Sequence, residues 1–181
     1  MTNPGSIDRR PAALLCDRDG TLVTDVPYNR DPALVEPLPG VAAALDRARA
    51  AGVRVGIVSN QRGVARKLIT EAELRAVNAR VEQLLGPFAA VCCCEHDVAD
   101  RCRCRKPGPG LVLRAAAMLG VSPAECVVVG DAWSDVGAAR SAGAMAILLT
   151  SGGVPVASGA VMTCPDLPAA VDLLLARCEA A

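Results

Sequence analysis

Asp17-Arg18-Asp19-Gly20-Thr21 follows an apolar run, Ala12-Ala13-Leu14-Leu15-Cys16, near the start of the chain. A short apolar run that ends in charged residues is typical of a buried strand. In an open parallel α/β sheet, the active site lies beyond the C-terminal ends of the strands. Asp17 is suited there to attack as a nucleophile and carry an aspartyl-phosphate, and Asp19 to give and take a proton. Gly20 then allows the chain to turn sharply away.

Strand-like and helical patterns alternate through the rest of the chain. Such alternation predicts parallel strands joined by helices, so the fold class that we expect is α/β, a three-layer Rossmann-like parallel sheet flanked by helices. Thr70-Glu71-Ala72-Glu73 is a capping box that begins one of the helices. The expected strands are 12–16, 53–58, 89–93, 126–129, 144–149 and an edge strand at 161–164, and the expected helices are 41–51, 71–84, 110–119, 134–142 and 167–177.

Length and composition predict a single domain over residues 1–181, with residues 1–11 loose. No insertion between Thr21 and Pro39, or between Ser59 and Cys94, is long enough for a cap domain, so we expect a capless fold. A net charge of zero and 2% aromatic residues argue against a nucleic-acid partner. The chain shows no signal peptide and no membrane span, so we expect a cytoplasmic protein. We also expect a monomer.

Polar motifs follow three further strands or loops. Ser59-Asn60-Gln61 ends the second strand and can hold a phosphate oxygen, although the same residues suit an ordinary polar loop. Arg105-Lys106-Pro107 opens a helix, and its lysine can neutralise a transferring phosphoryl group. Gly130-Asp131 ends a later strand, where a carboxylate suits Mg²⁺. Asp135, one turn further on, is either a second metal ligand or an acid favoured by the helix dipole.

A second cluster combines Cys94-Glu95-His96 with Cys102-Arg103-Cys104, and its histidine is the only one in the chain. Three cysteines and one histidine form a closed structural zinc set. The alternative is a cysteine-rich loop of buried thiols. Cys92 or Cys93 could replace a ligand, although strand alternation should turn Cys93 towards the core. The ligands that we expect are Cys94, His96, Cys102 and Cys104.

These motifs together resemble the aspartate-nucleophile phosphohydrolases of the haloacid dehalogenase superfamily, and within it a capless, zinc-containing branch. The resemblance implies that Asp17 is the nucleophile, Asp19 the acid/base, and Ser59 and Lys106 the residues that steady the phosphoryl group. It also implies that Mg²⁺ is held by Asp17, the carbonyl of Asp19, and Asp131. The zinc site would then shape the loop that presents Arg105 and Lys106.

The branch contains both heptose bisphosphate phosphatases and histidinol-phosphate phosphatases. Asp25-Val26-Pro27-Tyr28 and Arg62-Gly63-Val64-Ala65-Arg66 resemble the heptose side, whereas the short loop from His96 to Cys102 resembles the histidinol side. We therefore expect a Mg²⁺-dependent phosphomonoesterase that acts on a small phosphorylated metabolite, most simply a sugar bisphosphate. A catalytically idle zinc-binding interaction module is the alternative from another class. The substrate-binding residues that we expect are Asp25, Tyr28, Asn60, Gln61, Arg62 and Arg105.

Overall fold

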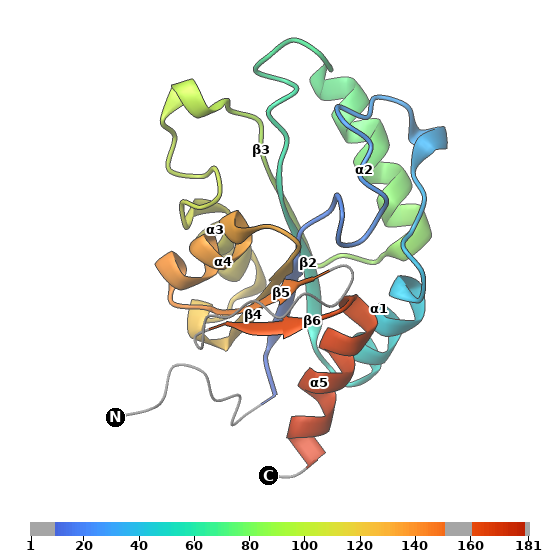
Figure 1. Ribbon diagram of the computed structural model, residues 1–181, viewed down its shortest axis with the longest axis vertical. Helices are drawn as coiled ribbons and strands as arrows, with labels where there is room; N and C mark the ends of the chain where they lie inside the picture. The colour runs from blue at the N-terminus through green and yellow to red at the C-terminus, as the bar shows by residue number, and fades with distance from the viewer. Residues whose placement is uncertain (1–9, 151–160, 180–181) are drawn as a thin grey trace.

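The computed structural model describes residues 10–150 and 161–179, and these form one parallel sheet covered by helices (Figure 1). The expectation for the first nine residues lies outside the described part. The sheet has six strands in the order β3-β2-β1-β4-β5-β6, and all neighbouring strands run parallel. The strands are β1 Ala13–Cys16, β2 Arg54–Asn60, β3 Ala90–Cys94, β4 Cys126–Gly130, β5 Met145–Leu149 and β6 Met162–Cys164.

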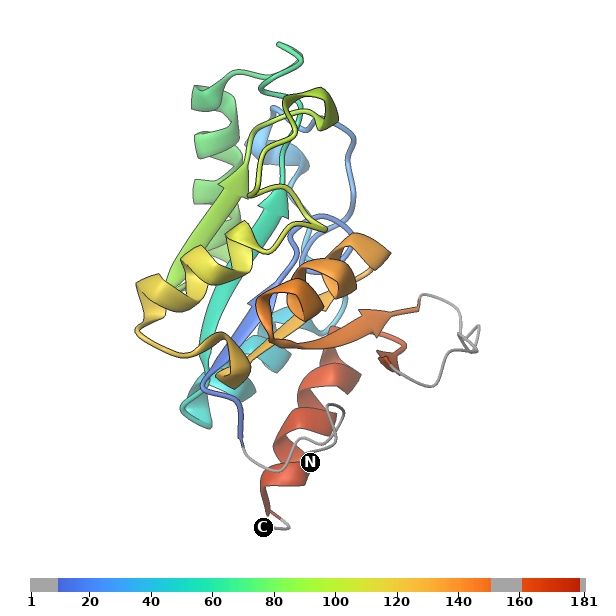
Figure 2. The same ribbon diagram turned by 90° about the vertical axis from the view of Figure 1, so that its left-hand side faces the viewer.

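Helices cover both faces of this sheet and make a three-layer molecule (Figure 2). The α-helices are α1 Val41–Ala50, α2 Glu71–Leu85, α3 Gly110–Leu119, α4 Trp133–Ala142 and α5 Leu167–Glu179. The first, second and fifth pack on one face, and the third and fourth pack on the other. The predicted α/β class and its layers are therefore confirmed.

The two cores follow from the alternation of side chains along each strand. In β1, Leu14 and Cys16 join the core beneath α1, α2 and α5, while Ala13 and Leu15 join the core beneath α3 and α4. All four side chains are fully buried. A strand buried on both faces reads as a continuous apolar run, because neither face has to carry polar residues.

Element boundaries agree with the sequence-based ones to within two residues, and those of α3 coincide. The capping box is confirmed: the Thr70 hydroxyl accepts from the Glu73 N–H, and the Glu73 carboxylate accepts from the Thr70 N–H. Three short 3-10 helices were not expected. They are η1 Pro32–Leu34, η2 Val98–Asp100 and η3 Pro123–Glu125. Within the described residues, the segments after β1 and β2 contain no separate folded unit, in agreement with a capless fold.

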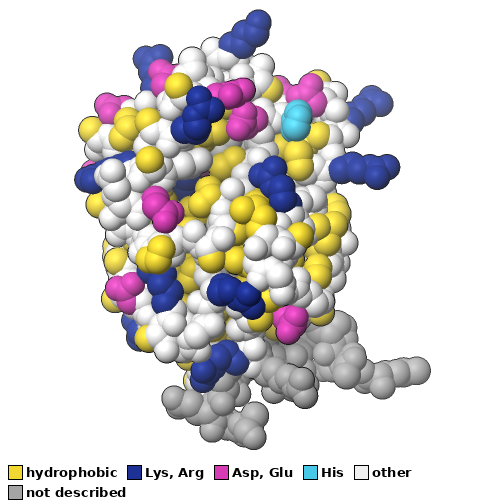
Figure 3. All heavy atoms as spheres, turned by 180° about the vertical axis from the view of Figure 1, so that it is seen from behind, with side chains coloured by type: hydrophobic (Ala, Val, Ile, Leu, Met, Phe, Trp, Pro, Cys, Tyr) yellow, Lys and Arg dark blue, Asp and Glu magenta, His cyan; other side chains and the backbone are white. Residues whose placement is uncertain are grey.

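Charges are mixed on the face of the molecule that is hidden in Figure 1. Seen from behind, basic and acidic side chains alternate with apolar ones and do not gather into a patch of one sign (Figure 3). This mixture agrees with the net charge of zero. None of the helices in the described ranges combines the length and the apolar character that a membrane crossing requires.

Candidate active site

The strand order places the site. The chain builds β1, β2 and β3 outward in one direction and then returns to place β4 on the other side of β1. Ligands of open α/β sheets bind at such a reversal, beyond the C-terminal ends of the strands. Asp17 follows β1 and its N–H donates to the Val129 carbonyl of β4 at 2.9 Å. Asp131 follows β4. The two acids therefore meet at the switch point.

Three carboxylates gather there. Oxygens of Asp17, Asp131 and Asp135 lie within 4.8 Å of one another. Gly20 makes room for one of them, because a Cβ at that position would lie 2.3 Å from the Asp131 Oδ2. Its φ of +74° also favours glycine. The glycine of the first motif thus permits both the turn and the close approach of Asp131 to the backbone beside Asp19.

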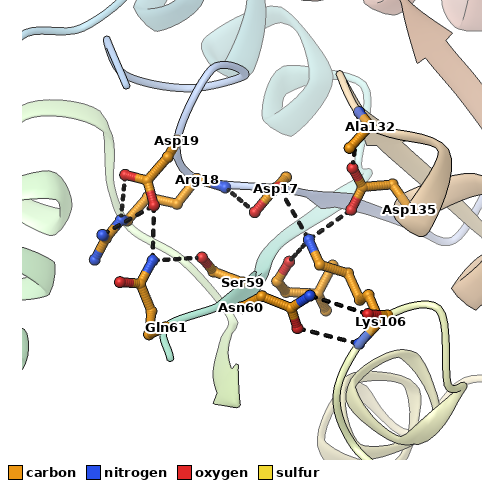
Figure 4. Close-up of polar contacts among 10 residues, drawn as sticks. Asp17, Arg18, Asp19, Ser59, Asn60, Gln61, Lys106, Ala132 and Asp135 are labelled. Carbon is orange, nitrogen blue, oxygen red and sulfur yellow. Dashed lines mark hydrogen bonds and ion pairs between the residues drawn. The ribbon is translucent and has the colours of Figure 1, made fainter. Parts of the chain in front are cut away.

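Lys106 is the cation of this cluster. Its Nζ lies 3.0 Å from the Asp17 Oδ2 and 2.5 Å from the Asp135 Oδ1, and it donates to the Val58 carbonyl at 2.8 Å (Figure 4). The side chain is 1% exposed. Burial lowers the pKa of Lys106, but the two carboxylates outweigh burial and hold the pKa above its ordinary value. The ammonium is therefore charged and points at the proposed nucleophile.

Asp135 has two partners, and the sequence did not predict that it would have both. One oxygen pairs with Lys106, and the other accepts from the Ala132 N–H at 3.2 Å, which caps α4. Burial raises its pKa, and the charge of Lys106 opposes this rise. The acid thus serves the helix N-terminus and also positions the lysine. Gly130 is required here, because a Cβ would overlap the Asp135 carboxyl at 2.3 Å.

Asp17 lies in an environment that disfavours its charge. Burial raises the pKa of Asp17 to about 6, and the nearby Asp135 contributes to the rise, while the Lys106 ammonium opposes it. The Arg18 N–H donates to the Asp17 Oδ1 at 2.7 Å and also favours the anion. At neutral pH the carboxylate is mostly ionised, as a nucleophile must be.

Asp19 points away from this cluster. Its carboxylate accepts from the Arg18 Nε and Nη2, both at 3.0 Å, and from the Gln61 Nε2 at 2.7 Å (Figure 4). Gln61 also lies 2.8 Å from the Ser59 Oγ. Ser59 and Gln61 are thus linked to Asp19 from the end of β2. Arg18 was overlooked in the sequence because a charged residue after a strand is usually solvated, whereas here it is 1% exposed.

Asn60 has a backbone partner. Its amide Nδ2 donates to the Lys106 carbonyl, and its Oδ1 accepts from the Lys106 N–H, each at 3.1 Å. Asn60 therefore has a structural role besides the expected one in substrate binding, because its amide holds both the N–H and the carbonyl of Lys106. The sequence indicated this role only weakly, because nothing about a polar residue at the end of a strand identifies its distant partner.

A pocket of about 270 Å³ opens beside Asp19. It brings together five of the expected substrate-binding residues, from the loop after β1 and from the end of β2 with the loop that follows it. Arg105 is not among its lining residues. The Arg62 guanidinium lies over the Tyr28 ring, 6.0 Å from its centroid. The lining residues are Arg18, Asp19, Asp25, Val26, Pro27, Tyr28, Asn60, Gln61, Arg62 and Gly63.

The four expected zinc ligands converge at the end of β3 and on the loop that follows it. The Sγ atoms of Cys94, Cys102 and Cys104 are 3.3 to 3.6 Å apart. The His96 Nδ1 lies 3.2 Å from the Cys104 Sγ and 3.6 Å from the Cys94 Sγ. A tetrahedral zinc–thiolate site has sulfurs about 3.8 Å apart, given bonds of about 2.3 Å. The donor set and its spacing fit zinc.

Backbone N–H groups support this cluster. The Arg105 N–H donates to the Cys102 Sγ at 3.4 Å. Burial raises the pKa of Cys102, but this N–H and the neighbouring thiols outweigh it, so the pKa is lowered. Such contacts to a sulfur are typical of the outer shell of a metal site.

Cys92 and Cys93 do not belong to the cluster. Cys92 lies on the same face of β3 as Cys94 and its thiol contacts the Met118 Sδ at 3.7 Å. Cys93 faces the other side of the strand and accepts from the Asn78 Nδ2 at 3.5 Å. Cys93 thus faces the α2 side of the sheet, as strand alternation predicts, but it is only partly buried there. β3 is an edge strand, so the face that Cys93 shares with Val91 is only partly covered.

Known proteins are similar in sequence to this chain. The family model described as haloacid dehalogenase-like hydrolase matches residues 27–143. A D-glycero-beta-D-manno-heptose-1,7-bisphosphate 7-phosphatase of Rhodopseudomonas palustris is 38% identical, over 76% of this chain and 82% of that one. A D-glycero-alpha-D-manno-heptose-1,7-bisphosphate 7-phosphatase of Mycobacterium tuberculosis is 35% identical, over 80% and 84%.

A solved structure of known function has a similar fold. The D,D-heptose 1,7-bisphosphate phosphatase of B. bronchiseptica, crystallised with magnesium and phosphate, superposes with a TM-score of 0.79. It is 31% identical and covers 91% of this chain and 98% of that one. The fold and the comparisons together define a hydrolase, so the prediction of an enzyme is confirmed. The chain belongs to the haloacid dehalogenase-like hydrolase family.

Proposed function

We propose that this protein is a Mg²⁺-dependent phosphomonoesterase that removes the 7-phosphate of D-glycero-D-manno-heptose 1,7-bisphosphate in the cytoplasm. The observation that carries the proposal is the buried Lys106 ammonium between the carboxylates of Asp17 and Asp135, with Asp131 beside them. This arrangement offers a nucleophile and a positive charge at one point, as phosphoryl transfer requires. The relatives named above support the substrate.

The residues divide the reaction into two steps. An Asp17 oxygen attacks phosphorus and forms the aspartyl-phosphate, while Asp19 gives its proton to the departing sugar oxygen. Asp19 then takes a proton from the water that attacks the phosphorus, which breaks the acyl-phosphate bond and returns Asp17. Lys106 and Ser59 hold the phosphoryl oxygens, with Lys106 balancing their negative charge.

The proposed magnesium ligands fit a hard cation. Asp17 and Asp131 offer carboxylate oxygens within 4.8 Å of each other, and the backbone beside Gly20 adjoins Asp131. Oxygen ligands of this kind suit Mg²⁺. When bound there, the ion would neutralise charge on the transferring phosphoryl group. Zinc would be held by Cys94, His96, Cys102 and Cys104 in a structural role, since all four positions are protein ligands.

Arg62 is the residue that we expect to hold the second, non-reacting phosphate. It lines the pocket beside Tyr28, and arginine binds phosphate through two donors. Arg105 can assist from the zinc loop, where its Nη1 lies 3.5 Å from the His96 carbonyl. Arg66 is less free, because Asp97 and Tyr28 already engage it.

Arg62→Ala should raise the KM for heptose 1,7-bisphosphate about tenfold, the effect of losing a charge-assisted contact. The KM for the corresponding 7-phosphate, which lacks the second phosphate, should change little. Arg80→Ala, which removes a partly exposed arginine of α2 that does not line the pocket, is the matched control. Steady-state kinetics on the two substrates would measure this. Equal changes for both substrates would argue against a second phosphate at Arg62.

Histidinol phosphate is the alternative substrate against which heptose 1,7-bisphosphate should be compared. Its far end carries an amine and an imidazole, which an arginine would not favour. We expect a higher kcat/KM for heptose 1,7-bisphosphate. A preference for histidinol phosphate would overturn the choice of substrate and leave the phosphatase proposal in place, whereas activity on neither compound would contradict both.

Asp97 connects the zinc loop to this pocket. Its Oδ2 accepts from the Arg66 Nε at 2.7 Å, and the Arg66 Nη1 lies 3.4 Å from the Tyr28 Oη. Asp97→Asn should raise the KM about two- to fivefold and leave kcat unchanged, because the ion pair is partly exposed and such pairs contribute about 1 kcal/mol or less. Glu71→Gln, which breaks an exposed ion pair of α2, is the control and should not change the KM.

A further inference from the structure

Arg18 is held on two sides. Its Nε and Nη2 donate to the two carboxylate oxygens of Asp19, each at 3.0 Å, and its Nη1 donates to the Asn78 Oδ1 at 2.7 Å. The residue is 1% exposed. A buried guanidinium that lacked an acceptor would be costly, so each of these partners fixes the orientation of the group.

Asn78 lies on a rigid element. It follows Val77, one of four α2 residues buried against the sheet, and the capping box at Thr70 begins that helix. Its Nδ2 donates to the Cys93 Sγ at 3.5 Å, which leaves its Oδ1 facing Arg18. A guanidinium offers only N–H donors, so the amide must turn its oxygen, and not its NH₂ group, towards Arg18.

We propose that Asn78 is a positioning residue for Asp19, acting through Arg18. Asn78 fixes the guanidinium, and the two-pronged contact of the guanidinium then sets the direction of the Asp19 carboxylate, with Gln61 as a third support at 2.7 Å. This inference rests on the proposed acid/base role of Asp19. Asn78 is not among the residues that line the pocket, so its effect on the reaction has to pass through Arg18, which lines the pocket beside Asp19.

Two phosphate esters separate this role from general loosening of the fold. Phenyl phosphate has a poor leaving group that needs a proton from Asp19, whereas p-nitrophenyl phosphate has a good one that needs little help. Both test the first chemical step through kcat/KM. A misplaced acid slows the first ester more, while a partly unfolded enzyme loses activity on both esters equally.

Asn78→Leu removes the acceptor at nearly constant size. We expect kcat/KM to fall at least about tenfold for phenyl phosphate and less than about threefold for p-nitrophenyl phosphate, a modest share of what general acid catalysis can supply. Asn78→Asp keeps an acceptor for Arg18 and should stay near wild type on both esters. Gln83→Leu, the same kind of change at an exposed position of α2, should alter neither.

Arg18→Lys decides the matter if the leucine variant does not fold, because it keeps the charge and loses the two-pronged contact. It should show the same difference between the esters. Equal losses on both esters, or no loss in a folded Asn78→Leu protein, would overturn the proposal. If the wild-type protein hydrolyses neither ester, the proposed function fails, which is a separate outcome.

Discussion

Asp17→Asn should reduce phosphatase activity by at least about a thousandfold, because the amide cannot attack phosphorus. The change keeps the size of the side chain and the contact to the Arg18 N–H, so the protein should remain folded. Hydrolysis of p-nitrophenyl phosphate with saturating Mg²⁺ would measure the loss. Near wild-type activity in this variant would disprove the covalent mechanism.

Stability gives a second measurement on the same variant. Folding raises the pKa of Asp17 from 3.8 to about 6, so ionisation of this group destabilises the metal-free protein as the pH rises through that interval. The asparagine removes this penalty but also one partner of Lys106, which keeps Asp135. We therefore expect the metal-free variant at pH 7 to melt within a few degrees of wild type.

Asp19→Asn is the comparison variant for the nucleophile. It should also lose most activity, yet it retains Asp17 and can still form some phosphoenzyme with an activated ester. A stoichiometric burst of p-nitrophenol without turnover would show this. No burst should occur with Asp17→Asn, and a burst there would assign the nucleophile to another residue.

Cys104→Ser should remove zinc and lower stability and activity together. The Cys104 Sγ lies within 3.4 Å of the other two cluster sulfurs and 3.2 Å from the His96 Nδ1, so it contacts every other ligand. We expect about one zinc per wild-type chain. Loss of a structural metal should cost at least about 3 kcal/mol, or roughly 10 °C in melting temperature for a chain of this size.

The loss of activity has a structural route. The Gln61 N–H donates to the Cys94 carbonyl, and the Lys106 backbone is bonded to Asn60, so the zinc loop is attached to the end of β2. Without zinc, this attachment loosens and the lysine is no longer held. Added Mg²⁺ should restore activity after chelation only where zinc has been retained.

Cys93→Ser is the control for the zinc site. Cys93 is adjacent to a ligand in the sequence but faces the opposite side of β3, so this variant should keep its zinc. Metal analysis of protein prepared without chelators would measure both variants. Wild-type protein free of zinc, or equal zinc content in the Cys104→Ser and Cys93→Ser variants, would contradict the proposed site.

The sequence by itself determined the fold class and the position of each motif. Buried strands such as 126–129 are recognisable because both of their faces are apolar, and the helices because their caps and apolar spacing are local. Motifs at the ends of parallel strands must meet at one edge of the sheet. Four ligands within eleven residues likewise need no long-range information to be brought together.

Only the tertiary structure decided which side chains pair across that edge. Asn78 and Arg18 are sixty residues apart, and Asp97 and Arg66 are thirty-one apart. Their contacts depend on the order of the strands and on how the loops lie against one another. The same holds for the two partners of Asp135 and for the incomplete burial of Cys93 on an edge strand. Local periodicity carries no record of these distant neighbours, because each segment would show the same pattern in another strand order.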